Sequence, residues 1–440
     1  MNTERASDLF LKVLNGHRQW MSVKAICDRL NSAGFDAVLA GGSVRDGLMG
    51  VCPKDFDVAT NALPDEVEAI FEKTVAVGKQ FGVIVVPQSN GLDGIEIATF
   101  RRDGNYEDGR RPTGVIFADR REDAYRRDFT VNALFFDPKE NSIIDYVGGR
   151  LDIENKILRV VGDPTLRFRE DKLRLLRAVR FTGQLGFELE PETEAAIRLM
   201  AKELSVVSRE RIRDEVDKML GAKFAAQGFA ALKALKLSDT VFGNYADAIL
   251  PPSDFVFDAQ DLDTKRLLLF WPTLKAMPHS RLQDCLNGWK YGRGFTELAA
   301  WLVTSFDRLT PTTPDPVPEL KDRAKVIQEF QISVESSAVT PTFFESEWMT
   351  ALELWTGEKA KAARPALNVL KQNLEQVDRA LIRRGLKVGE ANPNRANAED
   401  LFQKPDGSKL SGPLLGRELR RLNRELLLNG FNALNVHSQR

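Results

Sequence analysis

Apolar and polar positions alternate along the chain in patterns that predict a mixed α and β region followed by helices. Residues 8–33 repeat apolar positions at helical spacing and end at Gly34, a typical helix stop. Residues 35–42 predict a strand that runs into a glycine turn, 44–50 a short helix, and 64–71 a helix opened by proline. Further β-rich segments lie at 56–59, 83–87, 95–100, 132–137 and 142–146. The first 150 residues therefore predict one mixed α+β domain.

From Arg167 onward the pattern changes to long amphipathic helices with few strand signals. Proline clusters at 251–252 and 311–318 interrupt this part. The stretch 390–411 is rich in Asn, Pro, Gly and Ser and predicts a linker before a last basic helix. We therefore expect the second part of the chain to be helical.

Composition bounds the class of protein. The 440 residues suggest about three domains, and no run of 18 apolar residues occurs, so no membrane helix is expected. The charged N-terminal residues lack the apolar stretch of a secretory signal. Cys27, Cys52 and Cys285 are far apart and have no metal-site spacing, which favours a reduced, cytoplasmic protein. The net charge of −1 decides nothing about nucleic acid, but arginines gather at 159–213 and 417–424.

The first chemically informative block is Gly41-Gly42-Ser-Val-Arg45-Asp, followed by Asp55-Phe-Asp57. Two glycines after a strand let a ligand approach the backbone, and a helix that begins there offers N–H groups to phosphate. Asp55 and Asp57 alternate along the expected strand, so both carboxylates should project from one face. Such a pair can share the Mg²⁺ ions of a phosphoryl-transfer site. An isolated Asp-x-Asp would more often be a solvent-facing strand, but its spacing from the glycine block favours the metal site.

Two further blocks carry arginine and aspartate. Arg126-Arg127-Asp128 can hold a triphosphate and a ribose hydroxyl, because guanidinium is a planar and permanently charged fork. Positions 171, 174, 177 and 180 step by three along an expected helix. There Asp171 and Arg174 would place an acceptor beside a donor, able to read the edge of a base. A plain salt bridge on an exposed helix is the alternative. The segment 145–153 is interpreted as a structural hinge.

In this order and spacing, the blocks resemble the class II nucleotidyltransferase family, which contains bacterial CCA-adding enzymes and bacterial poly(A) polymerases. The resemblance covers about residues 37–220. It implies an α+β, polymerase-β-like catalytic head followed by an all-helical neck, body and tail. We place these at 1–150 (head), 151–220 (neck, base selection), 221–385 (body) and 386–440 (tail, tRNA binding).

The resemblance also implies roles for residues. Asp55 and Asp57 would bind the catalytic Mg²⁺ ions. The nucleotide would be bound by a larger set, in which Gly42 and Arg45 meet the triphosphate and Asp171 and Arg174 the base: Gly41, Gly42, Arg45, Arg126, Arg127, Asp128, Asp171, Arg174, Arg177 and Arg180. Glu96 is either a third carboxylate near the metals or structural. The segment 99–112 would be the mobile loop that accompanies addition of the terminal adenosine.

The expected activity is template-independent addition of CCA to the tRNA 3′ end from CTP and ATP, with release of pyrophosphate. An enzyme that adds only the terminal A, and a poly(A) polymerase, share the same motifs and remain alternatives. Phe81 is followed by Gly82, which is closer to the tRNA branch of the family. The intact metal carboxylates argue against a catalytically dead RNA-binding relative. The basic helix after Gly416 would either touch tRNA backbone or be an ordinary surface helix, and the sequence does not predict the oligomeric state.

Overall fold

The computed structural model describes residues 2–5, 7–88, 93–103, 115–249 and 262–300, except 278, 294, 297 and 298. The chain divides into two compact units, Met1–Pro251 and Pro252–Arg440. Every described residue of the predicted catalytic blocks lies in the first unit. The expected tail at 386–440 and the last basic helix lie outside the described residues.

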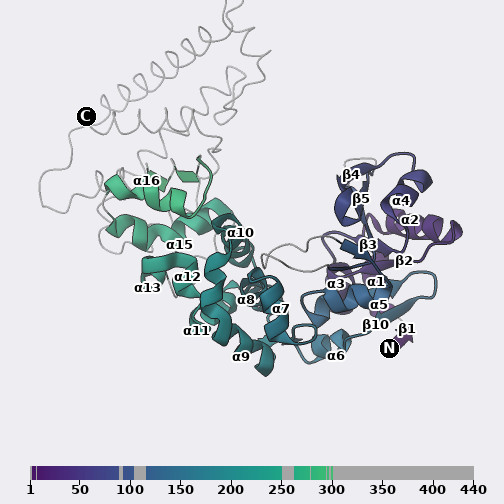
Figure 1. The fold of residues 1–440 in the computed structure, drawn as a ribbon, viewed down its shortest axis with the longest axis horizontal. Helices are drawn as coiled ribbons and strands as arrows, with labels where there is room; N and C mark the ends of the chain where they lie inside the picture. Colours follow the sequence, from purple (N-terminus) through teal and green to yellow (C-terminus); the bar gives the residue numbers. More distant parts are fainter. Residues whose placement is uncertain are drawn as a thin grey trace, which may run out of the picture. The chain divides into compact units, whose positions relative to one another are not determined.

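A mixed sheet forms the framework of the first unit (Figure 1). Within the described residues it has eight strands in the order β1-β10-β9-β2-β3-β6-β5-β4. Strand β3 is antiparallel to β2 and parallel to β6. The strands are β1 Asn2–Arg5, β2 Ala37–Ala40, β3 Asp57–Thr60, β4 Val75–Gly78, β5 Val83–Val86, β6 Ile95–Thr99, β9 Leu134–Asp137 and β10 Ser142–Asp145.

Alternating residues of the central strands cover two different cores, as expected for a sheet buried on both faces. Leu39 and Val58 pack in one cluster with residues from α1, α2, α3 and α4. Val38 and Ala59 belong to the opposite cluster, which includes Ala124 of α5. The helices are α1 Asp8–Asn15, α2 Trp20–Ser32, α3 Gly42–Leu48, α4 Pro64–Ile70 and α5 Arg120–Arg126.

The prediction of one helix over 8–33 is wrong, because the chain breaks between α1 and α2. The N–H of Gly16 caps α1 by bonding back to Lys12 and Leu14, and four residues then separate the helices. The predicted stop at Gly34 is confirmed: its φ is +89°, and the N–H of Phe35 bonds to the carbonyl of Leu30. This is the left-handed helix ending that glycine permits at lowest cost.

The expected loop at 99–112 begins within ordered strands. Thr99 ends β6, and Arg101–Asp103 forms β7, which pairs with β8 Val115–Phe117. The backbone N–H of Arg101 also donates to buried Asp123. Residues 104–112 lie outside the described part of the chain.

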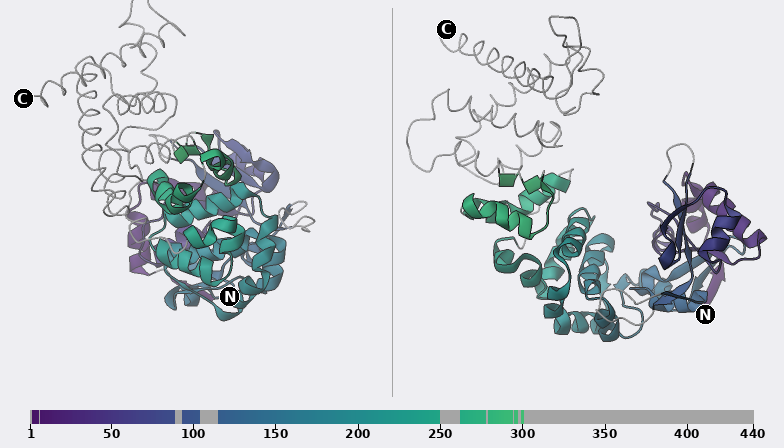
Figure 2. Two further views of the ribbon diagram at one scale, coloured as in Figure 1. Left: turned by 90° about the vertical axis from the view of Figure 1, so that its left-hand side faces the viewer. Right: turned by 45° about the horizontal axis from the view of Figure 1, so that its top comes forward.

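Helices dominate after the sheet, as predicted. Figure 2 shows the strands of the large sheet in the purple-to-blue part and mainly helices in the teal and green part. The α+β fold class is confirmed, while the domain boundaries at 150, 220 and 385 stay predictions. The remaining elements of the first unit are short β11 Ile157–Leu158 and β12 Glu188–Leu189, 3-10 turns η1 Lys79–Phe81, η2 Thr130–Asn132, η3 Ala201–Val206 and η4 Gly243–Tyr245, and helices α6 Gly149–Glu154, α7 Pro164–Glu170, α8 Leu173–Leu185, α9 Pro191–Met200, α10 Arg209–Leu220, α11 Ala225–Ala234, α12 Ser238–Phe242 and α13 Ala246–Ile249.

The described part of the second unit contains α15 Leu262–Ala276 and α16 His279–Gly288. Aromatic residues fill its core: Phe270 stacks on Trp289 with ring centroids 4.3 Å apart and meets Tyr291 edge-on. Across the described residues of both units, no helix combines the length and apolar character needed to cross a membrane.

Candidate active site

One pocket in the first unit gathers the predicted catalytic residues. Its volume is about 720 Å³. All twelve residues predicted from the sequence line it, together with Arg101, Asn132, Leu173, Phe181, Gln184 and Arg211. The sequence blocks are separated by up to about a hundred residues, so the fold and not local spacing brings them together.

The glycine block forms the turn between β2 and α3. Gly41 has φ +73° and ψ −129°, a conformation that only glycine adopts readily, and α3 begins at Gly42. A Cβ on Gly41 would lie 2.8 Å from Nη1 of Arg127. Arg45, in α3, is 4% exposed and donates to Asp46 and to the side-chain oxygen of Asn132. The turn therefore brings backbone and two arginines close together.

The two expected metal carboxylates lie at the beginning of β3. The strand starts at Asp57, opposite Ala40, so Asp55 precedes it and the prediction that both alternate along a strand is wrong. Pairing with β2 ends at Ala40, because the chain turns there into α3. Both carboxylates nevertheless line the pocket. Glu96 pairs in register with Asp57 on β6 but does not line the pocket.

The electrostatics around Asp57 fit a divalent cation. Partial dehydration by the surrounding protein, with the like charges of Asp55 and Glu96, raises the pKa of Asp57 to about 6 against the attraction of Arg127. A bound cation would relieve this repulsion. No group of three or more Asp, Glu, His or Cys side chains suited to a metal occurs among the described residues. Two carboxylates suffice for Mg²⁺, which takes its other ligands from phosphates and water.

A buried carboxylate holds the adjacent arginines of the second block. Asp123, 1% exposed, accepts from Nε of Arg126 at 2.8 Å and from Nε and Nη2 of Arg127 at 3.1 and 2.9 Å. Burial alone would raise the pKa of Asp123, but the two guanidinium groups lower it below its usual range. Because one carboxylate orients both arginines, they face the pocket together rather than diverging at the end of α5.

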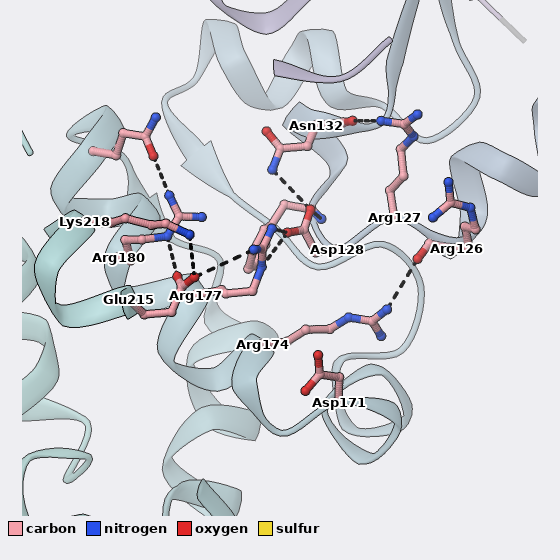
Figure 3. Close-up of polar contacts among 12 residues, drawn as sticks. Arg126, Arg127, Asp128, Asn132, Asp171, Arg174, Arg177, Arg180, Glu215 and Lys218 are labelled. Atoms are coloured by element: carbon pink, nitrogen blue, oxygen red, sulfur yellow. Dashed lines mark hydrogen bonds and ion pairs between the residues drawn. The ribbon is translucent and has the colours of Figure 1, made fainter. Parts of the chain in front are cut away.

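Asp128 is held from three sides. Its Oδ2 accepts from Nε of Arg177 at 3.0 Å, and its Oδ1 accepts from the N–H of Phe129 and the amide of Asn132 (Figure 3). Burial opposes its charge, but these donors lower the pKa of Asp128 to about 2. Asp128 is therefore a fixed anion among the pocket arginines.

The expected base-reading pair departs from the predicted geometry. Helix α7 ends at Glu170 and α8 begins at Leu173, so Asp171 lies in a break and does not share a helix with Arg174. The break occurs because the Asp171 side chain caps the N–H of Leu173. Arg211 of α10 donates to Asp171 at 2.7 Å, while Arg174 pairs with Glu170. Both predicted residues still line the pocket.

An aromatic ring and a buried glutamate organise the remaining arginines. Glu215 of α10 is 3% exposed and accepts from Nε of Arg180. The guanidinium groups of Arg45, Arg177 and Arg180 lie 5.7, 5.6 and 3.8 Å from the centre of the Phe181 ring. Stacking on a ring lets positive charges gather with less repulsion. Arg177 and Arg180 thus already have carboxylate partners.

Sequence reasoning missed six residues of the pocket wall. Asn132 could have been found, because it follows Asp128 by four positions in the same block. Gln184 could also have been found, because it follows Arg180 by four positions on α8 and accepts from it, whereas Arg211 gave no local signal, because it reaches the pocket from α10. Glu215, which orients Arg180 from α10, was missed for the same reason, whereas Asp123 lies only three and four positions before the arginines that it orients.

Comparison with known families agrees with this geometry. The model of the poly A polymerase head domain matches residues 37–159. A second model, described as a probable RNA and SrmB-binding site of polymerase A, matches residues 186–249.

Curated relatives extend the match. A CCA-adding enzyme of Geobacillus thermodenitrificans is 47% identical over 214 residues, and the chain spans about half of that relative, 52%. The CCA-adding enzyme of Leuconostoc citreum is 36% identical over 64% of this chain and 70% of its own length. That of Lactobacillus helveticus is 35% identical over 72% of this chain and 76% of its own.

Solved structures share the fold. The Bacillus stearothermophilus CCA-adding enzyme in complex with CTP aligns with a TM-score of 0.60 and 28% identity, over 96% of this chain and 94% of that one. The Thermotoga maritima CCA-adding enzyme complexed with tRNA aligns with a TM-score of 0.58 at 18% identity, over 99% and 100%. The second likeness is one of fold.

The mixed sheet, the carboxylates at the start of β3 and the arginine-lined pocket place the chain among nucleotidyltransferases with the poly(A) polymerase head. Within that class, the chain belongs to the family of CCA-adding enzymes. The resemblance inferred from the sequence blocks is confirmed. Members of this family use a divalent metal ion.

Proposed function

We propose that this chain adds C, C and A to the 3′ end of tRNA without a nucleic-acid template, using CTP and ATP and releasing pyrophosphate. The observation that carries the proposal is one pocket in which Asp55 and Asp57 accompany a cluster of fixed arginines. Relatives named CCA-adding enzymes support it, one of them solved with CTP and another with tRNA.

Asp55 and Asp57 would hold Mg²⁺ in this site. When bound, Mg²⁺ would neutralise phosphate charge and make the 3′-hydroxyl of the RNA a better nucleophile. Its preference for carboxylate and phosphate oxygens supports Mg²⁺ over softer metals.

Other pocket residues would bind the nucleotide. Gly41, Gly42 and Arg45 would meet the triphosphate, together with Arg126 and Arg127, whose orientation Asp123 fixes. Permanent charge and a planar fork suit these guanidinium groups to phosphate oxygens.

The sugar and the base would be read by the acidic residues of the pocket. Asp128 would accept a ribose hydroxyl, and Asp171 with Arg174 would read the edge of the base. Arg177 is paired with Asp128, and Arg180 is paired with Glu215. We therefore assign the two arginines to positioning these carboxylates.

The reaction needs little covalent chemistry from the protein. The 3′-hydroxyl oxygen attacks the α-phosphorus in line, a phosphodiester bond forms, and the bond to the β-phosphate breaks so that pyrophosphate leaves. The pocket contributes position and charge, which account for most of the rate enhancement in such transfers. A head at 1–150, a neck at 151–220, a body at 221–385 and a tail at 386–440 that contacts tRNA belong to the proposal.

A cytoplasmic location also belongs to the proposal. The free cysteines Cys27, Cys52 and Cys285 support a reducing compartment.

Transfer to a tRNA transcript lacking CCA, resolved to single nucleotides, tests the activity. We expect two additions with CTP alone and C, C and A with CTP and ATP together. A single A on a transcript ending in CC, without use of CTP, would identify an A-adding enzyme, and long A tails on unrelated RNA a poly(A) polymerase. Binding of tRNA without any incorporation would contradict the enzyme proposal.

A further inference from the structure

The two expected metal carboxylates differ in how the backbone beneath them is held. Asp57 begins β3 and pairs with Ala40 of β2, whereas Asp55 precedes the strand. In the segment 51–56, Pro53 and Phe56 are buried, while the other four residues, Asp55 among them, are exposed. The segment that carries Asp55 is therefore anchored to the protein through Pro53 and Phe56.

The side chain of His17 contacts both anchors from the turn between α1 and α2. Its imidazole meets the ring of Phe56 edge-on, with ring centroids 4.8 Å apart and an angle of 87° between the planes. A hydrogen bond also joins the imidazole to the backbone of Pro53, where the carbonyl is the acceptor because proline has no N–H. Edge-on ring contacts are directional, so this one favours a single orientation of Phe56. One imidazole thus holds the segment on both sides of Asp55.

The imidazole is itself fixed in place. Its Nδ1 accepts from the N–H of Gln19 at 3.1 Å, which leaves Nε2 to carry the proton. Burial and the charge of Arg18 lower the pKa of His17, against the hydrogen bond to Pro53, so the neutral ring is favoured. The side chain of Gln19, 5% exposed, donates to the carbonyl of Asp93 at 2.8 Å, two residues before β6. The turn is therefore fixed against the segments that lead into β3 and β6, which are neighbours in the sheet.

We propose that His17 is a positioning residue for the metal site. Through Pro53 and Phe56 it fixes the backbone that carries Asp55, so that the carboxylates of Asp55 and Asp57 lie ready to share Mg²⁺. His17 does not line the pocket, so it acts on the metal through these neighbours. Residues that orient metal ligands in this way affect metal affinity although they do not touch the ion. The inference rests on the proposed function, in which the two carboxylates bind Mg²⁺.

The test measures the Mg²⁺ requirement of the full chain in two ways, for the wild type, His17→Ala and His17→Leu. The first quantity is the Mg²⁺ concentration that gives half of the maximal rate of CTP transfer to a tRNA transcript lacking CCA. The second is the Mg²⁺ concentration that gives half of the maximal rise in melting temperature, without nucleotide or RNA. Leu30→Ala is the control for lost stability, because Leu30 is buried in the same core as Phe56, toward the opposite end of α2 from His17.

His17→Ala and His17→Leu lose the hydrogen bonds and the edge-on ring contact, so both Mg²⁺ concentrations should rise about tenfold. Saturating Mg²⁺ should restore most of kcat, and the KM for CTP measured there should stay unchanged, because the pocket arginines are untouched. His17→Phe keeps a ring against Phe56 and should need less Mg²⁺ than His17→Ala. Leu30→Ala should melt at a lower temperature but keep the wild-type Mg²⁺ concentrations. If His17→Ala does not fold, His17→Leu decides the test, because its side chain fills the space beside Phe56.

Wild-type Mg²⁺ concentrations in both His17→Ala and His17→Leu would overturn the inference. An equal rise in Leu30→Ala would also overturn it, because lost stability would then explain the effect. Absence of CTP transfer by the wild type would instead remove the proposed function. The melting measurement does not depend on transfer, so the two failures are distinguishable.

Discussion

Arg177 donates through both Nε and Nη2 to a single oxygen of Asp128, 49 residues earlier in the chain, at 3.0 and 2.5 Å. The contact links the segment after α5 to helix α8, and both residues line the same pocket. Arg177 also lies 3.9 Å from Glu215 of α10. The sequence blocks at 126–128 and 171–180 are therefore coupled through one ion pair, and the loss of Asp128 should affect folding as well as nucleotide binding.

The stability of the protein should fall in acid through Asp128. Its pKa is about 2 in the folded protein and 3.8 in the reference state, so the ion pair stabilises fully above about pH 4 and is lost as the pH falls through 2. The shift corresponds to about 2 kcal/mol. Chemical denaturation of the wild type and Asp128→Asn between pH 7 and pH 2 should show a difference in unfolding free energy that shrinks only below pH 4.

The exposed Asp28 of α2 provides the comparison, because Asp28→Asn removes a carboxylate without breaking a buried pair. Its unfolding free energy should follow the wild type throughout. If the difference in unfolding free energy between the wild type and Asp128→Asn stayed constant down to pH 2, the stabilising role assigned to the ion pair of Asp128 would be contradicted.

Gly41 and Gly50 should respond differently to alanine, although their φ angles are +73° and +72°. Alanine at either position adopts a strained backbone and should cost about 1–3 kcal/mol. At Gly41 the new methyl would also meet Arg127 at 2.8 Å, whereas at Gly50 its nearest neighbour is Leu9 at 3.6 Å. Both variants should lose stability, but only Gly41→Ala should raise the KM for CTP. If Gly41→Ala and Gly50→Ala had equal KM values for CTP, Arg127 could move away from the new methyl group without weakening nucleotide binding.

The residues expected to carry the chemistry could be predicted from the sequence, but their partners on other helices could not. Short blocks with fixed spacing identified the carboxylates and arginines, because the chemistry requires those types close together. The partner of Asp171 is Arg211, 40 residues later, and that of Arg180 is Glu215, 35 residues later. Both partners lie on α10, whose packing against α8 depends on the surrounding helices rather than on local pattern.

Helix ends were predictable only where one residue controls them. Helix α2 ends before Gly34 as expected, because glycine adopts the left-handed conformation there at lower cost than other residues. The breaks at Gly16 and Asp171 were missed, since the apolar spacing continues across both. After Gly16 the N–H of His17 bonds to Leu14, three residues back, so the α-helical pattern stops; at Asp171 the side chain accepts from the N–H of Leu173.

Asp57 should lower the stability of the metal-free protein although nucleotide transfer requires it. Because its folded pKa of about 6 exceeds the reference 3.8, ionisation of Asp57 destabilises the metal-free protein as the pH rises through 6. Asp57→Asn should therefore be more stable than the wild type in chelator at pH 7.5, by about 1 kcal/mol after solvent screening, and equal to it at pH 4. The same variant should lose nucleotide transfer by a factor of about 10³ or more.

Thermal melting with and without Mg²⁺ measures the metal's part in this difference. Added Mg²⁺ should raise the melting temperature of the wild type and not that of Asp57→Asn, because a ligand stabilises only the protein that binds it. An equal rise in the melting temperature of both proteins would show that the stabilising Mg²⁺ binds at a site that does not include Asp57.

Arg174 and Arg167 share the carboxylate of Glu170, which makes them a matched pair for testing base selection. Arg174 pairs with Glu170 and donates to the carbonyl of Arg167, and it lines the pocket, whereas Arg167 pairs with Glu170 without lining it. If Arg174 reads the base, Arg174→Ala should lower the preference for CTP and ATP over UTP and GTP by about 10–100-fold, the worth of a bidentate contact.

The pocket contacts of the triphosphate do not depend on Arg174, so the KM values should rise much less than the selectivity falls. Arg167→Ala removes the neighbouring ion pair and leaves Arg174 with Glu170, so it should reduce stability slightly and keep the selectivity. Single-nucleotide extension with each of the four nucleotides separately measures both variants. If the wild type used all four nucleotides equally, or if both variants lost selectivity alike, base reading would have to be reassigned to other residues of the pocket.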